Sequence, residues 1–429
     1  MKILAYGPQF YSPIFFRRWE LLAENHSDID ITLLTFRETV VDKKKSFSFG
    51  DTINYGKEID RNNFHIRFIK PVSWKIGWTS PDFKRIMKEI QPDIFYVQGQ
   101  FDLYLQQILF LRNRYFPKTK IVAFSMRGPA YNLSTWKQKV KPLGSYIKRR
   151  FFYYYVKMAT KYFNKYCDAV LCHYPKAVEC FREDGYNGPI YMQTQVGVNP
   201  ELFHEDDSAR ALIRKRYNLG DSYVFGSGTR FIIEKGVDDI IAALPDEGNW
   251  KYLIIGDGTA EEVSRIKKCI EKRNLPGKII MTGQVDLIDM PKYWNALDCV
   301  VHVPRSSIKW EETFSIALVQ AMITGKPIIA SDSGSVPYQV GPDGIVVPEG
   351  DIMAIREKML WAMNHQDEAR AIGKKMKERA YNCFSINHLN EMIYDTFVED
   401  ILHGKYDLNK FDMACYKTNS ERQNERKNY

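Results

Sequence analysis

The chain has 429 residues, of which 45% are hydrophobic and 26% charged; this is an ordinary globular composition, and the length exceeds what one hydrophobic core usually supports. No run of about twenty apolar residues occurs, which excludes a membrane-spanning helix of the usual length. The net charge of +9 suits an anionic partner, but no nucleic-acid recognition motif accompanies it, so we expect a two-domain globular protein that does not bind nucleic acid.

The first half of the chain alternates short apolar stretches with segments of helical period, which predicts a parallel α/β sheet. The expected strands are 2–5, 29–34, 65–69, 94–97, 121–124 and 169–172, and the expected helices include 15–24 and 103–113. Met1 leads directly into the first strand without the features of a signal peptide. We therefore expect a cytoplasmic protein.

The region 136–166 is rich in basic and aromatic side chains and contains no acidic residue. Such a surface suits the anionic headgroup layer of a membrane, which would make the protein peripheral at the inner face of the plasma membrane. The alternative is an ordinary domain helix with one buried and one solvated face. The buried face would carry Phe152, Val156, Ala159 and Phe163, and the solvated face Lys157, Lys161 and Lys165.

The second half shows the same alternation of strands and helices. Apolar strands that end in turns are expected at 224–230, 253–258, 279–285 and 298–304, with helical stretches such as 261–273 between them. The segment 196–203 contains Gly and Pro and suits a connector between domains, whereas 387–402 predicts a terminal helix. The last residues are polar and basic, which is typical of a flexible tail.

Glu312 stands just before an apolar helical run, so the backbone N–H groups of Thr313, Phe314 and Ser315 are expected to be unpaired donors of a helix N-terminus. An anion such as a diphosphate is favoured there. Gln320 follows eight residues after Glu312, which corresponds to nearly the same helix face and a distance of roughly 12 Å along the axis. One end would address a hexose and the other a ribose.

These residues resemble glycosyltransferase family 4, also called group 1, whose pattern is Glu, any residue, Phe, Gly, four residues and Glu-Ala-Met. Here Ser315 replaces the Gly, and Gln320 replaces the second Glu. The segment 224–241 is similar to the family's strand, Gly-Arg turn and Glu-Lys-Gly helix start. The resemblance covers about residues 190 to 360.

The resemblance implies an α/β protein of the GT-B fold, in which two Rossmann-like parallel-sheet domains face a central cleft. The expected domains are an acceptor-binding domain (1–199), a nucleotide-sugar-binding domain (200–383), a terminal helix that returns to the first domain (384–403) and a basic tail (404–429). The activity implied is retaining transfer of a hexose-type sugar to a glycan or lipid-linked glycan acceptor in surface polysaccharide synthesis. The donor would be a nucleotide sugar, either a UDP-sugar or a GDP-sugar, and no bound cofactor is expected.

The resemblance also implies roles for individual residues. Glu312 would orient the donor hexose, and Arg230 and Lys235 would offset the charge of the leaving diphosphate. The other donor contacts would be Gly228, Gly283, Val285, Thr313, Phe314, Ser315 and Gln320. On the acceptor side, Gly7 and Arg127 would contact acceptor or phosphate. No enzyme nucleophile is implied, because retention in this family is thought to proceed by attack on the face from which the phosphate departs.

Metal-dependent and cofactor-dependent alternatives fit less well. A GT-A enzyme needs an Asp-x-Asp motif at the end of a strand to hold a divalent cation, whereas the only match, Asp28-Ile29-Asp30, precedes an expected strand. Glu261 stands where a Rossmann dinucleotide motif needs a small residue, and no site for the pyridoxal phosphate of a phosphorylase is evident. The group Cys167, Cys172, His173 and Cys180 lacks the tight Cys-x-x-Cys pair of a zinc site. We expect no metal.

A hypothesis of a different class is a catalytically weak glycan- or partner-binding protein that keeps the GT-B fold. The departures from the family pattern at Gln320, Ser315 and Arg127 motivate it. The presence of Arg230 and Lys235 counts against it, because cations placed for a diphosphate have no use in a protein that never binds a donor.

Overall fold

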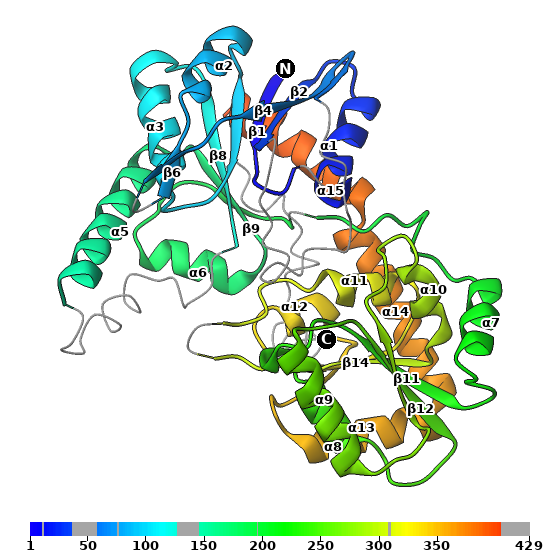
Figure 1. Cartoon of the computed structure of the whole chain (residues 1–429). Coiled ribbons are helices and arrows are strands. Elements are labelled where there is room, and N and C mark those ends of the chain that lie inside the picture. Colours follow the sequence, from blue (N-terminus) through cyan, green and yellow to red (C-terminus); the bar gives the residue numbers. More distant parts are fainter. Residues whose placement is uncertain are drawn as a thin grey trace, which may run out of the picture. The chain divides into compact units, whose positions relative to one another are not determined.

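The computed structural model describes residues 1–10, 13–36, 58–74, 77–126, 146–194, 196–307 and 310–404, with only the backbone of 13–14 and 146–150. These residues form two compact units. The first contains the described residues up to 197 together with 389–404, and the second contains 198–388. Figure 1 shows the elements of both units.

The first unit is built on an eight-stranded sheet with the strand order β10-β9-β8-β7-β1-β2-β4-β3. All neighbouring strands are parallel except β3 and β4. The strands are β1 (Lys2–Tyr6), β2 (Asp30–Phe36), β3 (Ile59–Arg61), β4 (Phe64–Ile69), β7 (Ile94–Gln98), β8 (Lys120–Ser125), β9 (Ala169–Cys172) and β10 (Ile190–Met192). All six strands predicted in this half are confirmed.

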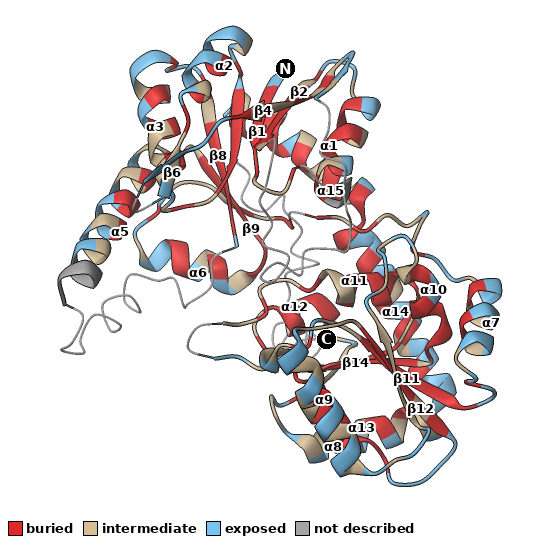
Figure 2. Cartoon of the chain, viewed as in Figure 1, coloured by how far each residue is buried: buried red, intermediate tan, exposed pale blue. Residues whose placement is uncertain are grey.

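The helices of the first unit are α1 (Pro13–Asn25), α2 (Asp82–Ile90), α3 (Leu103–Tyr115), α5 (Tyr146–Tyr166) and α6 (Pro175–Glu183). A small antiparallel pair, β5 (Val72–Trp74) and β6 (Gly77–Thr79), adds to them. The central strands are almost wholly buried, as the red ribbons of Figure 2 show. Parallel strands covered on both faces are continuously apolar, which is why they could be recognised in the sequence.

Helix α5 contains the described part of the basic and aromatic region. Val156, Ala159 and Phe163 are buried, and the ring of Phe163 lies 6.0 Å from that of Phe181 on α6. The buried face expected of an ordinary domain helix is therefore confirmed at these three positions, whereas Phe152 is half-buried. Lysines 137, 139 and 141, which belong to the same basic region, lie outside the described residues.

The second unit has a six-stranded parallel sheet with the order β13-β12-β11-β14-β15-β16. Its strands are β11 (Tyr223–Gly228), β12 (Trp250–Ile255), β13 (Ile279–Gly283), β14 (Cys299–His302), β15 (Ile328–Ser331) and β16 (Ile345–Val347). Its helices are α7 (Asp207–Arg216), η2 (Ile233–Lys235), α8 (Val237–Ala243), α9 (Ala260–Arg273), α10 (Met290–Ala296), α11 (Ile316–Ile323), α12 (Val336–Val340), α13 (Ile352–Asn364) and α14 (Gln366–Phe384). The four strands predicted here and the helix 261–273 are confirmed.

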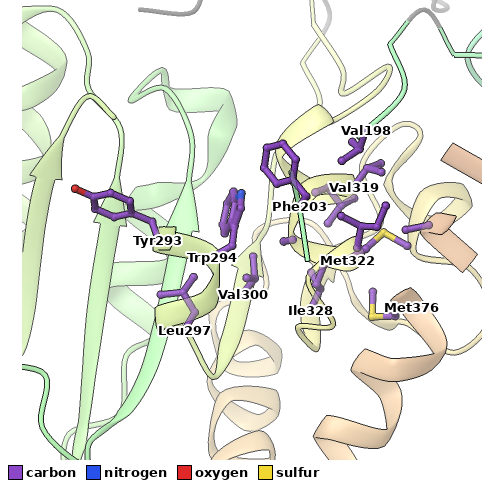
Figure 3. Packing of buried hydrophobic residues seen from close by; sticks show 14 of the residues in the cluster. Val198, Phe203, Tyr293, Trp294, Leu297, Val300, Val319, Met322, Ile328 and Met376 are labelled. Atoms are coloured by element: carbon purple, nitrogen blue, oxygen red, sulfur yellow. The ribbon is translucent and has the colours of Figure 1, made fainter. Parts of the chain in front are cut away.

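Two hydrophobic clusters cover the two faces of this second sheet. Successive residues of β11 contribute to different clusters: Val224 belongs to the first and Phe225 to the second. Figure 3 shows part of the first cluster, in which Trp294 of α10 and Val319 of α11 lie. The sheet is thus held between two apolar layers, as its uninterrupted apolar strands require.

The end of the described chain belongs to the first unit. Helix α15 (Ile386–Asp395) is followed by a π-helical segment, η3 (Thr396–Leu402). The ring of Tyr394 stacks on His26 at 3.9 Å, and Phe397 packs near Trp19 with ring centroids 6.4 Å apart. Residues after 388 therefore pack on α1 and its following turn.

Among the described residues, no helix is both long and apolar enough to cross a membrane. In the same part of the chain, no cluster of three or more His, Cys, Asp or Glu side chains has the arrangement of a metal site. Asp28 lies in a turn and Asp30 begins β2, so the Asp-x-Asp sequence stands at the amino end of a strand, as expected.

Candidate active site

The candidate site lies at the carboxyl edge of the second sheet, where its parallel strands end. Gly228 is the last residue of β11 and His302 is the last residue of β14. In open α/β sheets this edge is where ligands bind. The turn after β11 carries Arg230, Lys235 is the last residue of the following helical turn η2, and the loop after β14 leads to Glu312.

Lys235 and Glu312 form the central contact of the site. The Lys235 ammonium donates a hydrogen bond to Glu312 Oε2, although the two residues are far apart in the sequence. Glu312 is only 5% exposed. The ammonium also lies 5.2 Å from the centre of the Trp310 ring, a distance at which a cation is attracted by the ring face. The structure thus brings together the acid and the lysine that the sequence predicted.

The surroundings of Glu312 favour its charged form. Burial by itself would raise the pKa of the carboxyl, but Lys235, His302 and Arg230 act in the opposite direction and hold the pKa below its usual range. Arg230 is exposed, and its charge contributes to lowering the pKa of Glu312. Glu312 is therefore a carboxylate at neutral pH, surrounded by the cations expected to meet a diphosphate.

His302 completes this group from the end of β14. Its Nε2 atom lies 3.8 Å from Glu312 Oε2, too far for a hydrogen bond, and has no partner among the described residues. Burial, followed by the nearby Lys235 charge, lowers the pKa of His302 to about 4. The imidazole is therefore neutral near pH 7, and the Lys235 ammonium is the main cation beside Glu312.

Two glycines allow the backbones around this ion pair to approach closely. Gly236 has φ +68°, and a Cβ atom there would lie 2.1 Å from the Val303 carbonyl oxygen. Gly334 has φ +50°, and a Cβ atom there would lie 2.2 Å from the Glu312 carbonyl oxygen. Side chains are strongly disfavoured at both positions because of the positive φ and the lack of space. The Glu-Lys-Gly sequence thus reflects a packed turn.

The helix after Glu312 begins later than the sequence suggested. Helix α11 starts at Ile316, and Ser315 is its N-cap, with a side chain that accepts a hydrogen bond from Leu318 N. The helix-face relation expected between Glu312 and Gln320 is therefore wrong, because Glu312 precedes the helix. The Ser315 N–H is not an unpaired donor either, since it donates to Gln339 Oε1 at 2.8 Å.

Gln320 and Gly228 meet through Trp294. The indole N–H of Trp294 donates to Gln320 Oε1 at 3.4 Å. A Cβ atom at Gly228 would lie 2.4 Å from the same indole, so only glycine fits at the end of β11. Gln320 is 5% exposed, and its oxygen is directed to the tryptophan rather than left free.

The predicted base-binding loop begins at the end of β13. Gly283 has φ +74°, and its vacant side-chain position faces open space. Its carbonyl accepts a hydrogen bond from Gly256 N at 3.1 Å, and Gly256 in turn packs against the Thr229 carbonyl. The ends of β11, β12 and β13 are thus adjacent. Val285 is partly buried against the first hydrophobic cluster.

The remaining predicted residues differ in their surroundings. Thr313 is half-buried, and Phe314 packs against Phe384 with ring centroids 5.7 Å apart, so its ring serves the core of the second unit. Gly7 lies in the first unit, where it is buried and a Cβ atom would come within 2.7 Å of the Gln98 side chain. Arg127 lies outside the described residues.

Sequence reasoning missed His302, Trp294 and Trp310. A signal existed for His302, because a polar residue at the carboxyl end of an otherwise apolar strand often faces a ligand edge. Trp310 stands two residues before the motif acid, but its position in the sequence alone indicated no role. Trp294 had no such signal, since its contact with Gln320 depends on how α10 and α11 pack.

Residues 209–379 match the family model described as glycosyl transferases group 1. The chain is 28% identical over 191 residues to a GDP-mannose-dependent α-(1-6)-phosphatidylinositol monomannoside mannosyltransferase of Mycobacterium tuberculosis, covering 42% of this chain and 49% of that protein. It is 27% identical over 157 residues to the lipopolysaccharide core biosynthesis mannosyltransferase LpsB of Rhizobium meliloti, covering 35% and 43%. The chain therefore matches about half the length of such curated relatives.

Solved structures match over nearly the whole chain. Sucrose-phosphate synthase from Thermosynechococcus elongatus superposes with a TM-score of 0.67 at 16% identity, covering 92% of this chain and 98% of that one. Anabaena HepE in complex with UDP and glucose gives a TM-score of 0.65 at 16% identity, covering 93% and 100%. At this identity the likeness concerns the fold, and the expected GT-B architecture of two parallel-sheet domains is confirmed.

Proposed function

We propose that the chain is a retaining group 1 glycosyltransferase that moves a hexose-type sugar from a nucleotide diphosphate sugar to a glycan or lipid-linked glycan. The match of residues 209–379 to the group 1 family model and the mannosyltransferase relatives support this proposal. The observation that carries this proposal is the contact between Lys235 and Glu312 at the carboxyl edge of the second sheet. It joins a cation suited to phosphate with an acid suited to sugar hydroxyls.

In this proposal the two charges have separate partners during the reaction. The Lys235 ammonium, together with Arg230, binds the diphosphate and stabilises the negative charge that it gains as it leaves. Glu312, released from part of its interaction with Lys235, accepts hydrogen bonds from the hexose. The bond between the anomeric carbon and the diphosphate oxygen breaks, the acceptor oxygen bonds to that carbon on the same face, and the acceptor proton goes to the departing phosphate.

The donor-binding residues follow from the same site. The turn at Gly228, together with Thr313 and its loop, would contact the diphosphate and the hexose. Gly283 and Val285 would bind the base. Gln320 would accept one ribose hydroxyl. The relatives support a nucleotide sugar: one is described as GDP-mannose-dependent, and the solved HepE complex contains UDP and glucose. We propose a UDP-sugar or a GDP-sugar as donor.

Surface polysaccharide synthesis is the proposed context, and the relative named for lipopolysaccharide core biosynthesis supports it. We propose a cytoplasmic protein that meets the inner face of the plasma membrane through α5. That helix exposes Phe151, Tyr154 and Met158, with 63%, 48% and 71% of their surface free, beside the exposed lysines 157, 161 and 165. Apolar and basic groups together suit an anionic lipid surface.

Replacement of Lys157, Lys161 and Lys165 by Gln tests the membrane proposal. Binding to vesicles that contain phosphatidylserine should weaken at low salt, by about 1 kcal/mol for each cation near the surface, and the difference should shrink as salt rises. A matched variant with Lys267, Lys268 and Lys272 of α9 replaced by Gln should bind like the wild type. Equal binding by the α5 variant and the wild type at low salt would contradict the proposal.

A panel of UDP- and GDP-sugars tests the donor proposal. At least one of them should raise the melting temperature of the protein, because a ligand that binds only the folded state stabilises it by RT ln(1 + [L]/Kd). The same donor should release its nucleoside diphosphate when a suitable acceptor is present. No stabilisation by any nucleotide sugar would remove the basis of the assignment.

A catalytically weak glycan- or partner-binding protein is the second candidate. The observation that favours it is the Ser315 N–H, which is bonded to Gln339 instead of being available to a phosphate. This candidate predicts that nucleotide sugars bind, or fail to bind, without turnover. Measured transfer from a bound donor to any glycan would exclude it.

A further inference from the structure

The first unit contains a cavity of about 450 Å³ that none of the predicted donor residues lines. Its volume falls within the range of roughly 300 to 1,000 Å³ that is usual for small-molecule sites. It opens where β7 and β8 end, at Gln98 and Ser125, and one side is formed by Phe152 and Tyr155 of α5. As in the second unit, the cavity lies at the carboxyl edge of a parallel sheet.

The cavity wall combines aromatic rings with a small number of polar groups. The aromatic lining residues are Phe101, Tyr104, Phe124, Phe152 and Tyr155. The Tyr155 hydroxyl is fixed by a hydrogen bond to the Phe101 carbonyl at 2.6 Å. Rings held in place in this way offer flat apolar surfaces, and the C–H groups of a pyranose face are apolar as well. The lining thus suits one face of a sugar ring.

A hydrogen-bond donor in the wall has no partner. Gln100 is 5% exposed and lines the cavity, and its Nε2 atom has no hydrogen-bond partner among the described residues. Its Oε1 atom is 3.5 Å from the Ser125 hydroxyl. A buried amide N–H without an acceptor is costly, by about 1 to 3 kcal/mol. A hydroxyl oxygen of a ligand would supply that acceptor.

The charge of the cavity is negative. Asp102 is the charged member of the described lining, which contains no Lys, Arg or His. The carboxylate accepts a hydrogen bond from Gln100 N at 3.0 Å. Asp102 is exposed on one side. Where the carboxyl faces the protein it loses hydration, which raises its pKa, and no cation is among the groups that shift this pKa. An anionic ligand would meet a carboxylate that no cation of the described lining offsets.

Gly7 is linked to this wall. A Cβ atom at Gly7 would come within 2.7 to 2.9 Å of the Gln98 amide, so the glycine allows this side chain to lie against the end of β1. Gln98 itself lines the cavity. If the cavity binds an acceptor, Gly7 would act indirectly, by making room for the lining residue Gln98.

We propose that this cavity binds an uncharged sugar unit of the acceptor, through the Gln100 amide, the Asp102 carboxylate and the aromatic wall, and rejects acceptors that present an anionic group at this point. That the bound sugar is an acceptor rests on the proposed function, but the binding of the sugar to the cavity requires no donor. It specifies what the transferase would extend: a neutral glycan end in preference to a phosphate or uronate end.

Ligand-detected saturation-transfer NMR with the full chain tests the inference in the absence of a donor. The neutral probes are methyl glycosides of glucose, mannose and galactose, and the anionic probes are methyl glucuronide and glucose 6-phosphate. At least one neutral glycoside should bind, and the anionic probes should bind at least on the order of tenfold more weakly. Binding of an anionic probe as tight as that of the best neutral one would overturn the inference.

Two variants locate the binding. Gln100→Leu should weaken the neutral glycoside on the order of tenfold, the effect expected for one hydrogen bond in a buried site. Asp102→Asn keeps the shape of the side chain and an oxygen that accepts from Gln100 N, so the variant should fold normally. It should reduce the difference in affinity between the neutral and the anionic probes. Gln366→Leu in the second unit is the matched control and should change nothing. Unchanged affinities in both cavity variants would overturn the assignment.

The outcomes separate this inference from the proposed function. Binding of neutral glycosides as described, with no nucleotide sugar bound, would remove the transferase proposal and leave a carbohydrate site in the first unit. Transfer from a nucleotide sugar by a protein whose cavity variants are unaffected would leave the transferase and overturn the cavity.

Discussion

Both units carry polar groups at the carboxyl edge of a parallel sheet, but these groups are paired with each other only in the second unit. In the second unit, Lys235 and Glu312 are bonded to each other. Among the described residues of the first unit, Gln100 Nε2 has no hydrogen-bond partner, and the cavity lining contains no cation beside Asp102. A site whose charges already neutralise each other must exchange partners when a charged ligand binds, whereas a site with an unpaired donor gains a bond from a neutral ligand.

The comparison explains why the two sites would serve different substrates. A diphosphate brings charge and can compete with Glu312 for Lys235, because charge-assisted hydrogen bonds are the stronger ones. A sugar unit brings hydroxyls and apolar faces, which match the amide and rings of the first unit.

Glu312→Gln should have the largest effect. The amide keeps the shape but loses the charge that holds Lys235 and accepts from the hexose, so turnover should fall by roughly a hundredfold or more, the size seen when one group that stabilises a transition state is removed. Steady-state kinetics with the best donor provides the measurement. Glu311→Gln, the same charge change at the preceding residue, is the control and should keep most activity; full turnover in Glu312→Gln would mean that the acid is not used.

Lys235→Met and Arg230→Ala should differ in their effect on the stability of the protein, but both should weaken the binding of a nucleoside diphosphate. Removing Lys235 leaves the buried Glu312 carboxylate without its main cation, which should lower the free energy of unfolding by up to about 3 kcal/mol. Arg230 is exposed, so its removal should change stability by no more than about 0.5 kcal/mol.

Both variants should bind a nucleoside diphosphate about tenfold to a hundredfold more weakly, because each loses a charge-assisted bond. Urea denaturation and calorimetric titration measure the two effects. Equal stability losses in the two variants would contradict the paired state of Lys235, and unchanged binding in both would contradict the site.

The buried histidines of the two units should make the protein less stable in mild acid. Burial lowers the pKa of His302 from 6.5 to about 4 and that of His173 in the first unit from 6.5 to about 3. Each folded-state pKa is depressed, so the unfolded chain binds more protons between these values and stability is lost as pH falls from about 6.5 toward 4.

Each histidine should contribute on the order of 3 kcal/mol across that range. His302→Phe and His173→Phe should each reduce the fall in melting temperature between pH 7 and pH 5. Because the Lys235 charge acts on His302, Lys235→Met should also reduce the His302 contribution but leave that of His173 unchanged. A pH dependence identical to the wild type in His302→Phe would show that the imidazole is not held neutral.

Gln320→Glu should have the smallest effect. It should lower the melting temperature of the free protein, and a bound nucleoside diphosphate should offset this loss. A carboxylate can still accept from Trp294, but it would place a charge at a position that is only 5% exposed, so the free protein should lose about 1 kcal/mol of stability. With a nucleoside diphosphate bound, the carboxylate can accept from both ribose hydroxyls. Melting temperatures with and without ligand test this, and a loss that the ligand does not reduce would argue against a ribose contact at residue 320.

The sequence predicted the strands well because parallel strands buried on both faces are continuous apolar runs, as in 94–97 and 253–255. It also predicted that Lys235 and Glu312 belong to one site, through the resemblance of their motifs. It placed the start of α11 too early, because Ser315 caps the helix by accepting a hydrogen bond from Leu318 N. The Ser315 N–H donates to Gln339, a residue 24 positions away, which local sequence patterns do not indicate.

The unit 1 cavity could not be predicted in the same way. Gln98, Gln100 and Asp102 follow a strand that the sequence identified, but nothing in a single sequence indicates that α5 supplies Phe152 and Tyr155 opposite them. Similarly, the need for glycine at 228 arises from Trp294 on a distant helix. Contacts between elements that are remote in the chain are set by packing, which local patterns do not encode.

The central claim, that Arg230 and Lys235 bind the terminal phosphate of a nucleoside diphosphate, is tested most directly by calorimetric titration of UDP, UMP, GDP and GMP into the wild-type protein and the Arg230→Ala, Lys235→Met double variant. For one base, the wild type should bind the diphosphate at least tenfold more tightly than the monophosphate, and the double variant should lose that preference. Equal affinity for diphosphate and monophosphate in the wild type, or a preference that persists in the double variant, would contradict the account.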